Sequence, residues 1–449
     1  MSMCADARSC LVLAAGTVFL ATLLGATVSS DDQPRDDTVS DASCETNIYG
    51  AFRGPSSEHT LLHAQGKVLF PIGFYELPKD DAALKRMADA GVNFVRCGNR
   101  ADLDRVQAAG MFGWLPLDLS QGATDDLRSQ VNSVADNAAL AVWEGPDEVV
   151  WNFTGASSLY RELGVHKKGG AWKRRDPEAV AYAEEQAKRI IPNMRAAAEM
   201  IRGIDKQDRP IWINEARDSD ADYVRQYLGY IDITGCDIYP VKASERDVAQ
   251  VGAAVRRWKE IGGGKAVWMV LQAFSWDELG DYYGAKTTVY PTFAESRFMA
   301  YDAIANGAAG ILYWGSHYLK SDALRQSIYA LASEINRLQP FLVGPDVQGV
   351  RTSLKPGGPA SDAVKAMVRK ADGDSMILLL NEDGNASFDV AVEGLSDLNG
   401  KSLYCLYTSE TISLQQGRFS AHLGPLETKL YATDRKWESA LREGRDFKN

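Results

Sequence analysis

Short apolar runs alternate with amphipathic stretches between about residues 68 and 338 of this 449-residue chain. A brief apolar run bounded by turn residues is typical of a buried strand, whereas apolar residues at a spacing of three to four indicate a helix. The first unit combines a strand over 68–75 with a helix over 80–91 that stops at Gly91. The same order then repeats along the chain, which predicts a fold built from strand–helix units.

Further strands are expected over 92–97, 112–117, 138–142, 210–214, 231–238, 266–271 and 310–314. Further helices are expected over 101–110, 125–137, 178–204, 221–230, 245–261, 293–307 and 322–338. Eight units in about 270 residues match a (β/α)8 TIM barrel in number and size. A doubly wound open sheet is the alternative, but no Gly-rich dinucleotide motif follows the first predicted strand.

The pattern changes at about Val350. Strand-like runs over 376–380, 387–392, 403–407 and 428–431 are separated by turns that include 372–374 and 383–385. This spacing predicts a small antiparallel β-sandwich, and we place the barrel at 46–340, the sandwich at 341–435 and a tail at 436–449. Packing beside the barrel is its expected role, with sugar binding as the alternative.

The N-terminus has the order of a secretory signal. Arg8 precedes an apolar run from Cys10 to Val28, and small residues follow. We therefore expect a signal peptide at 1–30 and a disordered acidic tether at 31–45, which is rich in Ser and Thr. The protein is then secreted or periplasmic, without stable membrane association after cleavage. A single membrane anchor is the alternative, because about 20 apolar residues span a bilayer.

Charge and cysteine content narrow the partners. The net charge of -11 argues against nucleic acid as a partner. Beyond the signal, Cys44, Cys97, Cys236 and Cys405 lack metal-ligand spacing, and the five His are scattered. We therefore expect buried thiols, no metal centre and no cofactor.

The end of the fourth predicted strand concentrates candidate chemistry. Glu144, Asp147 and Glu148 follow an apolar run, beside Trp143 and a Gly-Pro turn. Burying charge costs several kcal/mol unless the charge is paired or used, so this clustering indicates acid/base chemistry. In a barrel, chemistry lies at the C-terminal strand ends, which also hold Tyr75, Glu76, Arg96, Asp118, Asn214 with Glu215, Asp237, Tyr239, Gln272 and Trp314. This acidic ring with aromatic members suits a sugar.

These strand ends resemble clan A of the glycoside hydrolases over roughly residues 65 to 340. That clan has a (β/α)8 barrel, often with a C-terminal β-sandwich, and an Asn-Glu pair ending its fourth strand. Here the fourth strand is followed by Gly-Pro-Asp147-Glu148, the second ends in Arg96, the sixth in Asp237-Ile-Tyr239-Pro, and the eighth in Tyr-Trp314. The resemblance implies an exported glycosidase that acts on an oligo- or polysaccharide, with Glu148 as the acid/base.

One position departs from that clan. The seventh strand ends in Gln272, where the clan carries its nucleophilic Glu, and an amide cannot attack as a carboxylate does. Candidates for the second carboxylate are Asp237, Glu278 on the following loop and Asp147. Gln272 is expected to hold a sugar hydroxyl. The other residues expected to bind substrate are Tyr75, Glu76, Arg96, Asp118, Trp143, Glu144, Asp147, Asn214, Tyr239 and Trp314.

Two other functions fit the sequence. A carbohydrate-binding protein on a degenerate glycosidase barrel would explain Gln272, and a metal-dependent barrel hydrolase is a weaker possibility because His is sparse. The basic loop 166–175, which contains Trp172, is either a solvated insert or a set of cations over the mouth for an anionic polysaccharide.

Overall fold

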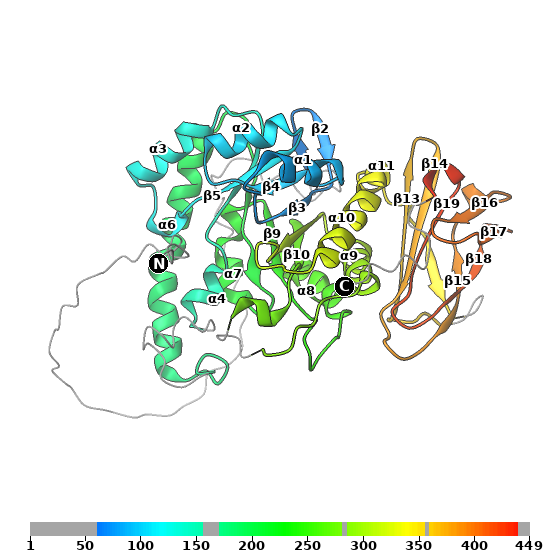
Figure 1. Ribbon diagram of the computed structural model, residues 1–449. Coiled ribbons are helices and arrows are strands. Elements are labelled where there is room, and N and C mark those ends of the chain that lie inside the picture. Colours follow the sequence, from blue (N-terminus) through cyan, green and yellow to red (C-terminus); the bar gives the residue numbers. More distant parts are fainter. Residues whose placement is uncertain (1–60, 156–169, 281–284, 355–358, 439–449) are drawn as a thin grey trace, which may run out of the picture. The chain divides into compact units, whose positions relative to one another are not determined.

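The computed structural model describes residues 61–155, 170–280, 285–354 and 359–438 (Figure 1). Its largest sheet closes on itself, because β10 (Ala266–Gln272) pairs in parallel with both β9 (Ile233–Asp237) and β11 (Gly310–Trp314). This closure confirms the (β/α)8 barrel and excludes the open sheet. The expected signal, the tether and residues 439–449 of the tail lie outside the described residues.

The barrel strands follow one another in chain order. They are β3 (Ile72–Phe74), β4 (Phe94–Arg96), β5 (Phe112–Pro116), β6 (Leu140–Glu144), β7 (Ile211–Trp212), β9, β10 and β11, which returns to β3. A further segment, β8 (Glu215–Ala216), also pairs with β9. Because β7 and β8 are consecutive, they together occupy the fifth strand position, with an interruption at 213–214.

Helices follow the strands as the periodicity predicts. They are α1 (Asp81–Asp89), α2 (Arg100–Ala108), α3 (Asp125–Val134), α6 (Pro177–Ile204), α7 (Ala221–Tyr227), α8 (Gln250–Gly262), α9 (Phe293–Ala305) and α10 (Asp322–Arg337). The first backbone N–H groups of several helices bond to side chains of the preceding residue, namely Asp80, Asn99, Thr124, Thr292 and Ser321. Each of the eight predicted strand–helix units is therefore present in the structure.

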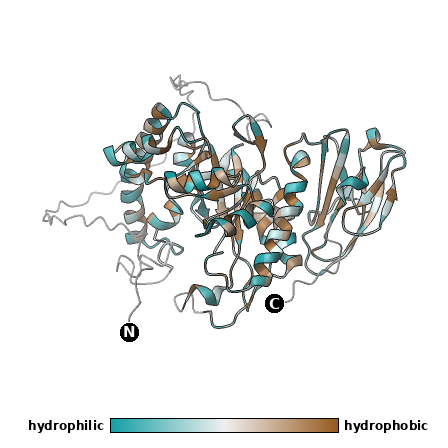
Figure 2. Cartoon of the chain, turned by 45° about the horizontal axis from the view of Figure 1, so that its top comes forward, coloured by the Kyte–Doolittle hydropathy of each residue, from teal (hydrophilic) through white to brown (hydrophobic). Residues whose placement is uncertain are grey.

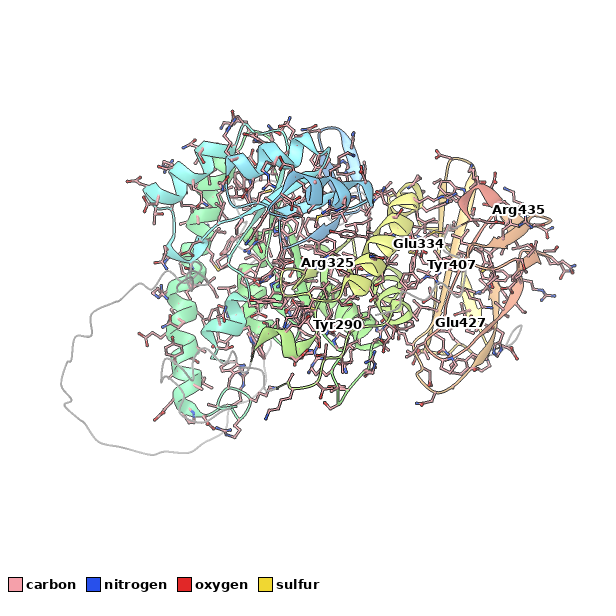
Figure 3. The ribbon with its side chains drawn as sticks, in the orientation of Figure 1. Tyr290, Arg325, Glu334, Tyr407, Glu427 and Arg435 are labelled. Atoms are coloured by element: carbon pink, nitrogen blue, oxygen red, sulfur yellow. The ribbon has the colours of Figure 1, made fainter. Side chains whose placement is uncertain are left out.

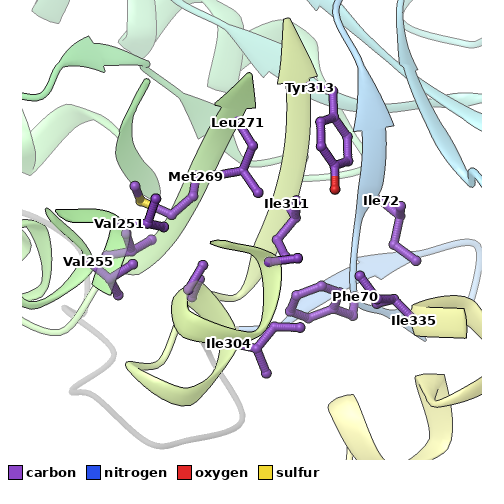
Figure 4. Close-up of a cluster of buried hydrophobic side chains, with 14 of the residues drawn as sticks. Phe70, Ile72, Val251, Val255, Met269, Leu271, Ile304, Ile311, Tyr313 and Ile335 are labelled. Atoms are coloured by element: carbon purple, nitrogen blue, oxygen red, sulfur yellow. The ribbon is translucent and has the colours of Figure 1, made fainter. Parts of the chain in front are cut away.

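Strand alternation divides the apolar core into two parts. Inside the barrel lie Phe94, Trp114, Trp212 and Trp268, which are fully buried. Phe94 stacks on Trp114, and the other ring contacts in this group are edge to face or tilted. Intervening residues point outward and pack against helices, as Ile72, Met269 and Ile311 do in Figure 4. Figure 2 shows the matching pattern, with apolar strands inside helices that are polar on one side.

A hairpin that the sequence analysis did not separate comes before the barrel. Strands β1 (Leu62–Ala64) and β2 (Lys67–Leu69) pair antiparallel, and the predicted first strand of 68–75 merges β2 with β3. Leu62 and Ala64 are buried with Ala266 and Ala309, which lie at or before the starts of their strands. The hairpin therefore covers the N-terminal end of the barrel interior and leaves the C-terminal end for the site.

The C-terminal part has two antiparallel sheets, as the sandwich prediction requires. One has the order β12 (Arg351–Ser353), β15 (Phe388–Glu393), β18 (Phe419–Leu423); the other has β13 (Val364–Ala371), β14 (Asp374–Asn381), β19 (Thr428–Ala432), β16 (Ser402–Cys405), β17 (Thr411–Ser413). Four of these strands, β12, β13, β17 and β18, were not predicted. Tyr407 connects this part to the barrel helices by donating to Glu334 of α10 (2.8 Å; Figure 3).

Cys97, Cys236 and Cys405 are buried free thiols, as expected, whereas Cys44 lies outside the described residues. Within the described ranges, no helix has the length and apolarity that a membrane span requires.

Candidate active site

Period-two alternation directs polar side chains from several strands into the C-terminal mouth of the barrel. Arg96 and Glu144 each lie two residues after a side chain that faces the barrel interior, namely Phe94 and Val142. Asp237 lies two residues after Gly235 on β9. Residues two apart on a strand point to the same side, so these three side chains also point inward. Asn214 follows Trp212 in the same way, at the interruption between β7 and β8. The structure therefore brings these four predicted site residues to one place.

Glu144 is fully buried and forms an ion pair with Arg96, whose Nε lies 2.6 Å from its Oε2. Desolvation raises the pKa of Glu144 to about 7, although the Arg96 charge lowers it. The guanidinium also lies over the Tyr75 ring, 5.3 Å from its centroid. Arg96 thus pairs with Glu144 inside the mouth through its Nε.

Asn214 holds the Asp147–Glu148 turn from the neighbouring strand. Its side-chain Nδ2 donates to Asp147 Oδ1 (2.9 Å). Its backbone carbonyl oxygen accepts from the Glu148 backbone N–H (2.9 Å). Desolvation raises the pKa of Asp147, while Arg96 and the Asn214 hydrogen bond lower it. The strand interruption therefore has a use, because it leaves the Asn214 backbone and side chain free to bond across to the turn.

Glu148 has a left-handed backbone, with φ 50° and ψ 42°. This conformation costs a residue with a Cβ about 1 kcal/mol or more, and it persists only where the surroundings fix it. Glu148 comes directly before the short helix α4 (Val149–Phe153). Its side chain is therefore aimed by the turn rather than by a regular strand or helix.

The carboxyl groups of Glu148 and Asp237 lie close enough for each to change the pKa of the other. Burial raises the pKa of Glu148, and the charges of Asp237, Asp147 and Glu215 raise it further. Burial and Asp147 also raise the pKa of Asp237, against a hydrogen bond from Tyr239. Two such groups cannot both ionise at close range, so the pair keeps a proton at neutral pH.

Several buried polar atoms near these acids have no hydrogen-bond partner among the described residues. They include Tyr75 Oη, Glu144 Oε1, Asn214 Oδ1 and Asp237 Oδ1. Tyr75, Glu144 and Asn214 are themselves buried, and leaving a polar atom without a partner there is costly. A bound molecule that reached these atoms would remove this cost.

An aromatic wall follows the sixth, seventh and eighth strands. Tyr239 stacks on Trp314, with ring centroids 5.5 Å apart and planes 23° from parallel. Phe274 and Trp276 contact Tyr239 edge to face, and Tyr318, which is 39% exposed, lies against Trp314. The sequence analysis did not select Tyr318, although its position four residues after β11 could have suggested it. This wall offers flat apolar surface beside the acids.

Trp143 does not belong to that wall, and its assignment to substrate binding was wrong. The residue is fully buried, and its Nε1 donates to Asp205 Oδ2 (2.8 Å) at the end of α6. Its neighbours Val142 and Glu144 face the barrel interior and the mouth, so alternation turns Trp143 toward the helices.

The expected role of Gln272 as a sugar contact was also wrong. Its side chain is fully buried and bonds only to backbone among the described residues, accepting from Val241 N and donating to Val241 O and Phe274 O. Gln272 therefore connects the chain that follows β9 to the chain that follows β10. A carboxylate here would face two carbonyl oxygens.

Three other predicted residues bond to loop residues and not to the acids of the mouth. Glu278 accepts from Tyr290 Oη, Lys320 N and Ser275 N, and no described hydrogen bond or ion pair joins it to the acids of the mouth. Asp118 is exposed and caps a short 3-10 helix through Ser120. Glu76 accepts from the 315–316 backbone and contacts His317 (3.1 Å). No described hydrogen bond or ion pair joins these three residues to the acids of the mouth, so they lie outside that cluster.

The described part of the basic loop, from residue 170, is occupied by internal contacts. Trp172 is buried against Tyr223, and the Arg175 guanidinium lies over its ring, 4.3 Å from the centroid. Arg175 also pairs with Asp220 (3.3 Å). These residues do not supply a free aromatic or cation to the mouth; residues 166–169 lie outside the described ranges.

No family model matches the sequence, and no curated protein matches it. Solved structures with a similar arrangement include the β-galactosidase of Bacillus circulans sp. alkalophilus, with 9% identity, TM-score 0.49, and coverage of 82% of this chain and 99% of that one. An α-amylase of Geobacillus thermoleovorans, complexed with acarbose, has 12% identity, TM-score 0.44 and coverages of 81% and 98%. The match to a Marinomonas ef1 β-galactosidase, at 13% identity and TM-score 0.41, covers 60% of each chain.

The different placement of two Trp residues predicts different effects of substitution. Trp143→Phe removes the hydrogen bond to Asp205 and should lower the free energy of unfolding by about 1–2 kcal/mol. Trp314 is only partly buried, so Trp314→Phe should change stability less. Denaturant titration of both variants measures the two effects. Equal destabilisation by the two substitutions would contradict the placement of Trp143.

The pKa shifts also predict how stability depends on pH. Because the pKa of Glu148 is raised on folding, its contribution is present below its unfolded pKa and lost as pH rises through the folded value. In wild type this loss of unfolding free energy amounts to at most about 1.4 kcal/mol per pH unit. Glu148→Gln has no proton to lose at this position and should not show it. Its melting temperature relative to wild type should therefore be higher at pH 9 than at pH 5. Asp118→Asn is the exposed control, and a Glu148→Gln difference independent of pH would contradict the shift.

Proposed function

We propose that this chain is an exported glycoside hydrolase that cleaves an oligo- or polysaccharide, with Glu148 as the proton donor. The main support is the Glu148–Asp237 pair, which keeps a proton at neutral pH at the mouth of a (β/α)8 barrel. A general acid must still carry its proton at the working pH. Export is supported by the charged, apolar and small-residue order of residues 1–30.

In this proposal a sugar ring lies on the wall of Tyr239 and Trp314, and its hydroxyl groups bond to Asn214 and Tyr75. Glu148 gives its proton to the glycosidic oxygen as the bond to the anomeric carbon breaks. Asp237 is the second carboxylate, and Asp147 is the alternative, because both lie close enough to influence the charge on Glu148. The second carboxylate either attacks the anomeric carbon or activates a water.

A non-catalytic carbohydrate-binding protein is the second candidate, and Gln272 is the observation that favours it. The seventh strand, which carries the nucleophile in clan A, here ends in an amide bonded to backbone. Such a protein would use the same wall and the same unpartnered polar atoms, without turnover.

One experiment separates these candidates. The purified protein is tested on a panel of neutral and amino glycans, with released reducing ends and binding enthalpy as the readouts. We expect turnover, and Glu148→Gln should lower kcat by about 10²–10⁴-fold, the usual contribution of a general acid. Asp118→Asn, on the rim but outside the acid cluster, should keep its activity. Binding without turnover in the wild type would favour the second candidate, and equal activity in Glu148→Gln would remove the assigned role.

A further inference from the structure

Glu215, to which the sequence analysis gave no role, is the most heavily bonded carboxylate near the mouth. It is fully buried and accepts from Val150 N (2.9 Å), Trp151 N (3.3 Å), Ser219 Oγ (2.7 Å) and Tyr227 Oη (3.0 Å). Each oxygen of the carboxylate thus receives two of these bonds. A buried carboxylate with this many donors is held in one orientation.

Two of these donors connect Glu215 to the strained residue of the candidate site. Val150 and Trp151 lie in the first turn of α4, which begins directly after Glu148. Backbone N–H groups in a first turn have no partner within their helix, so Glu215 on β8 supplies it from the neighbouring strand. Glu148 is therefore held on both sides. Its own N–H donates to Asn214 O, and the backbone just after it is bonded to Glu215.

The Glu215 charge acts on the same residue. Several groups face Glu148: Asp147 from its own turn, Asp237 from β9 and Glu215 from β8, and each raises the pKa of Glu148. Tyr227 of α7 and Ser219 face Glu215 in turn. Burial raises the pKa of Glu215 to about 7, and its hydrogen bonds oppose that rise.

We propose that Glu215 is a positioning residue, which holds the backbone of Glu148 in its left-handed conformation and helps it to retain its proton. The proposal rests on the proposed function in naming Glu148 as the acid. Its structural content can be measured without a substrate. Glu215 does not touch the sugar, because all four of its bonds are to the protein.

The test uses the full chain and two substitutions. Glu215→Gln keeps the shape and removes the charge, so the protonated carboxyl band of Glu148, assigned in infrared spectra by its loss in Glu148→Gln, should titrate at lower pH than in wild type. Glu215→Ala also removes the anchor, and amide exchange at Val150 and Trp151 should then be at least about tenfold faster. Where wild type turns over a glycan, the alkaline limit of kcat should move to lower pH in Glu215→Gln, with KM little changed.

Glu334→Gln is the matched control. Glu334 is also buried and accepts from two tyrosines, Tyr301 and Tyr407, but it belongs to α10 and contacts the β-rich part. It should not change the Glu148 titration. If Glu215→Ala does not fold, Tyr227→Phe removes one donor to Glu215 and should shift the same band and exchange rates less.

An unchanged Glu148 titration in Glu215→Gln would overturn the proposal, even with faster exchange in Glu215→Ala, because Glu215 would then only stabilise α4. Failure of the proposed function has a different signature, namely no turnover by wild type on the glycan panel while the Glu148 band still shifts.

Discussion

Neighbouring carboxyl groups that are removed from water cannot all ionise, and this constraint governs the mouth of the barrel. Each acid there meets it in a different way. Glu144 is neutralised by Arg96, Glu215 is surrounded by four donors, and Asp147 receives an amide hydrogen bond from Asn214. Among the described residues no ion pair joins Glu148 or Asp237 to a cation, and burial together with neighbouring negative charge raises the pKa of both.

The interruption of the fifth strand determines how Asn214 and Glu215 bond to the Asp147–Glu148 turn and to α4. A continuous strand would direct Asn214 and Glu215 to opposite faces and engage their backbone in regular pairing. With the break between β7 and β8, Asn214 bonds to Asp147 and to the Glu148 backbone, and Glu215 anchors α4. Asn214 and Glu215, at the fifth strand position, thereby hold the Asp147–Glu148 turn and the start of α4, which follow β6. The regular barrel supplies the frame, and this local irregularity sets the orientation of the acid.

Much of the fold and part of the site follow from local patterns. Short apolar runs predicted all eight strand positions, and strand ends predicted the convergence of Arg96, Glu144 and Asp237. The alternation that turns Trp143 outward is also visible in the sequence, because Val142 and Glu144 flank it. By contrast, Gln272 bonds to Val241, which lies 31 residues earlier in the chain, and Glu278 bonds to Lys320 in another loop. These partners are set by tertiary structure and cannot be predicted from local patterns. The residue types alone therefore suggested a role in the site for side chains that bond to other parts of the protein.

The proximity of Glu148 and Asp237 bears on how a substrate could enter. Retaining glycosidases hold their two carboxyl groups about 5–5.5 Å apart and inverting enzymes about 6.5–9.5 Å, so that the groups flank the sugar and not each other. In the proposed hydrolase, the sugar must therefore lie between the pair, and binding energy from the aromatic wall would supply the cost of ending their interaction. Glu148 would keep the proton, since Asp147 and Glu215 also act on its charge, and Asp237 would be left ionised. Substrate entry would then convert a pair that holds one proton into a separate acid and carboxylate, the two states that glycoside cleavage requires.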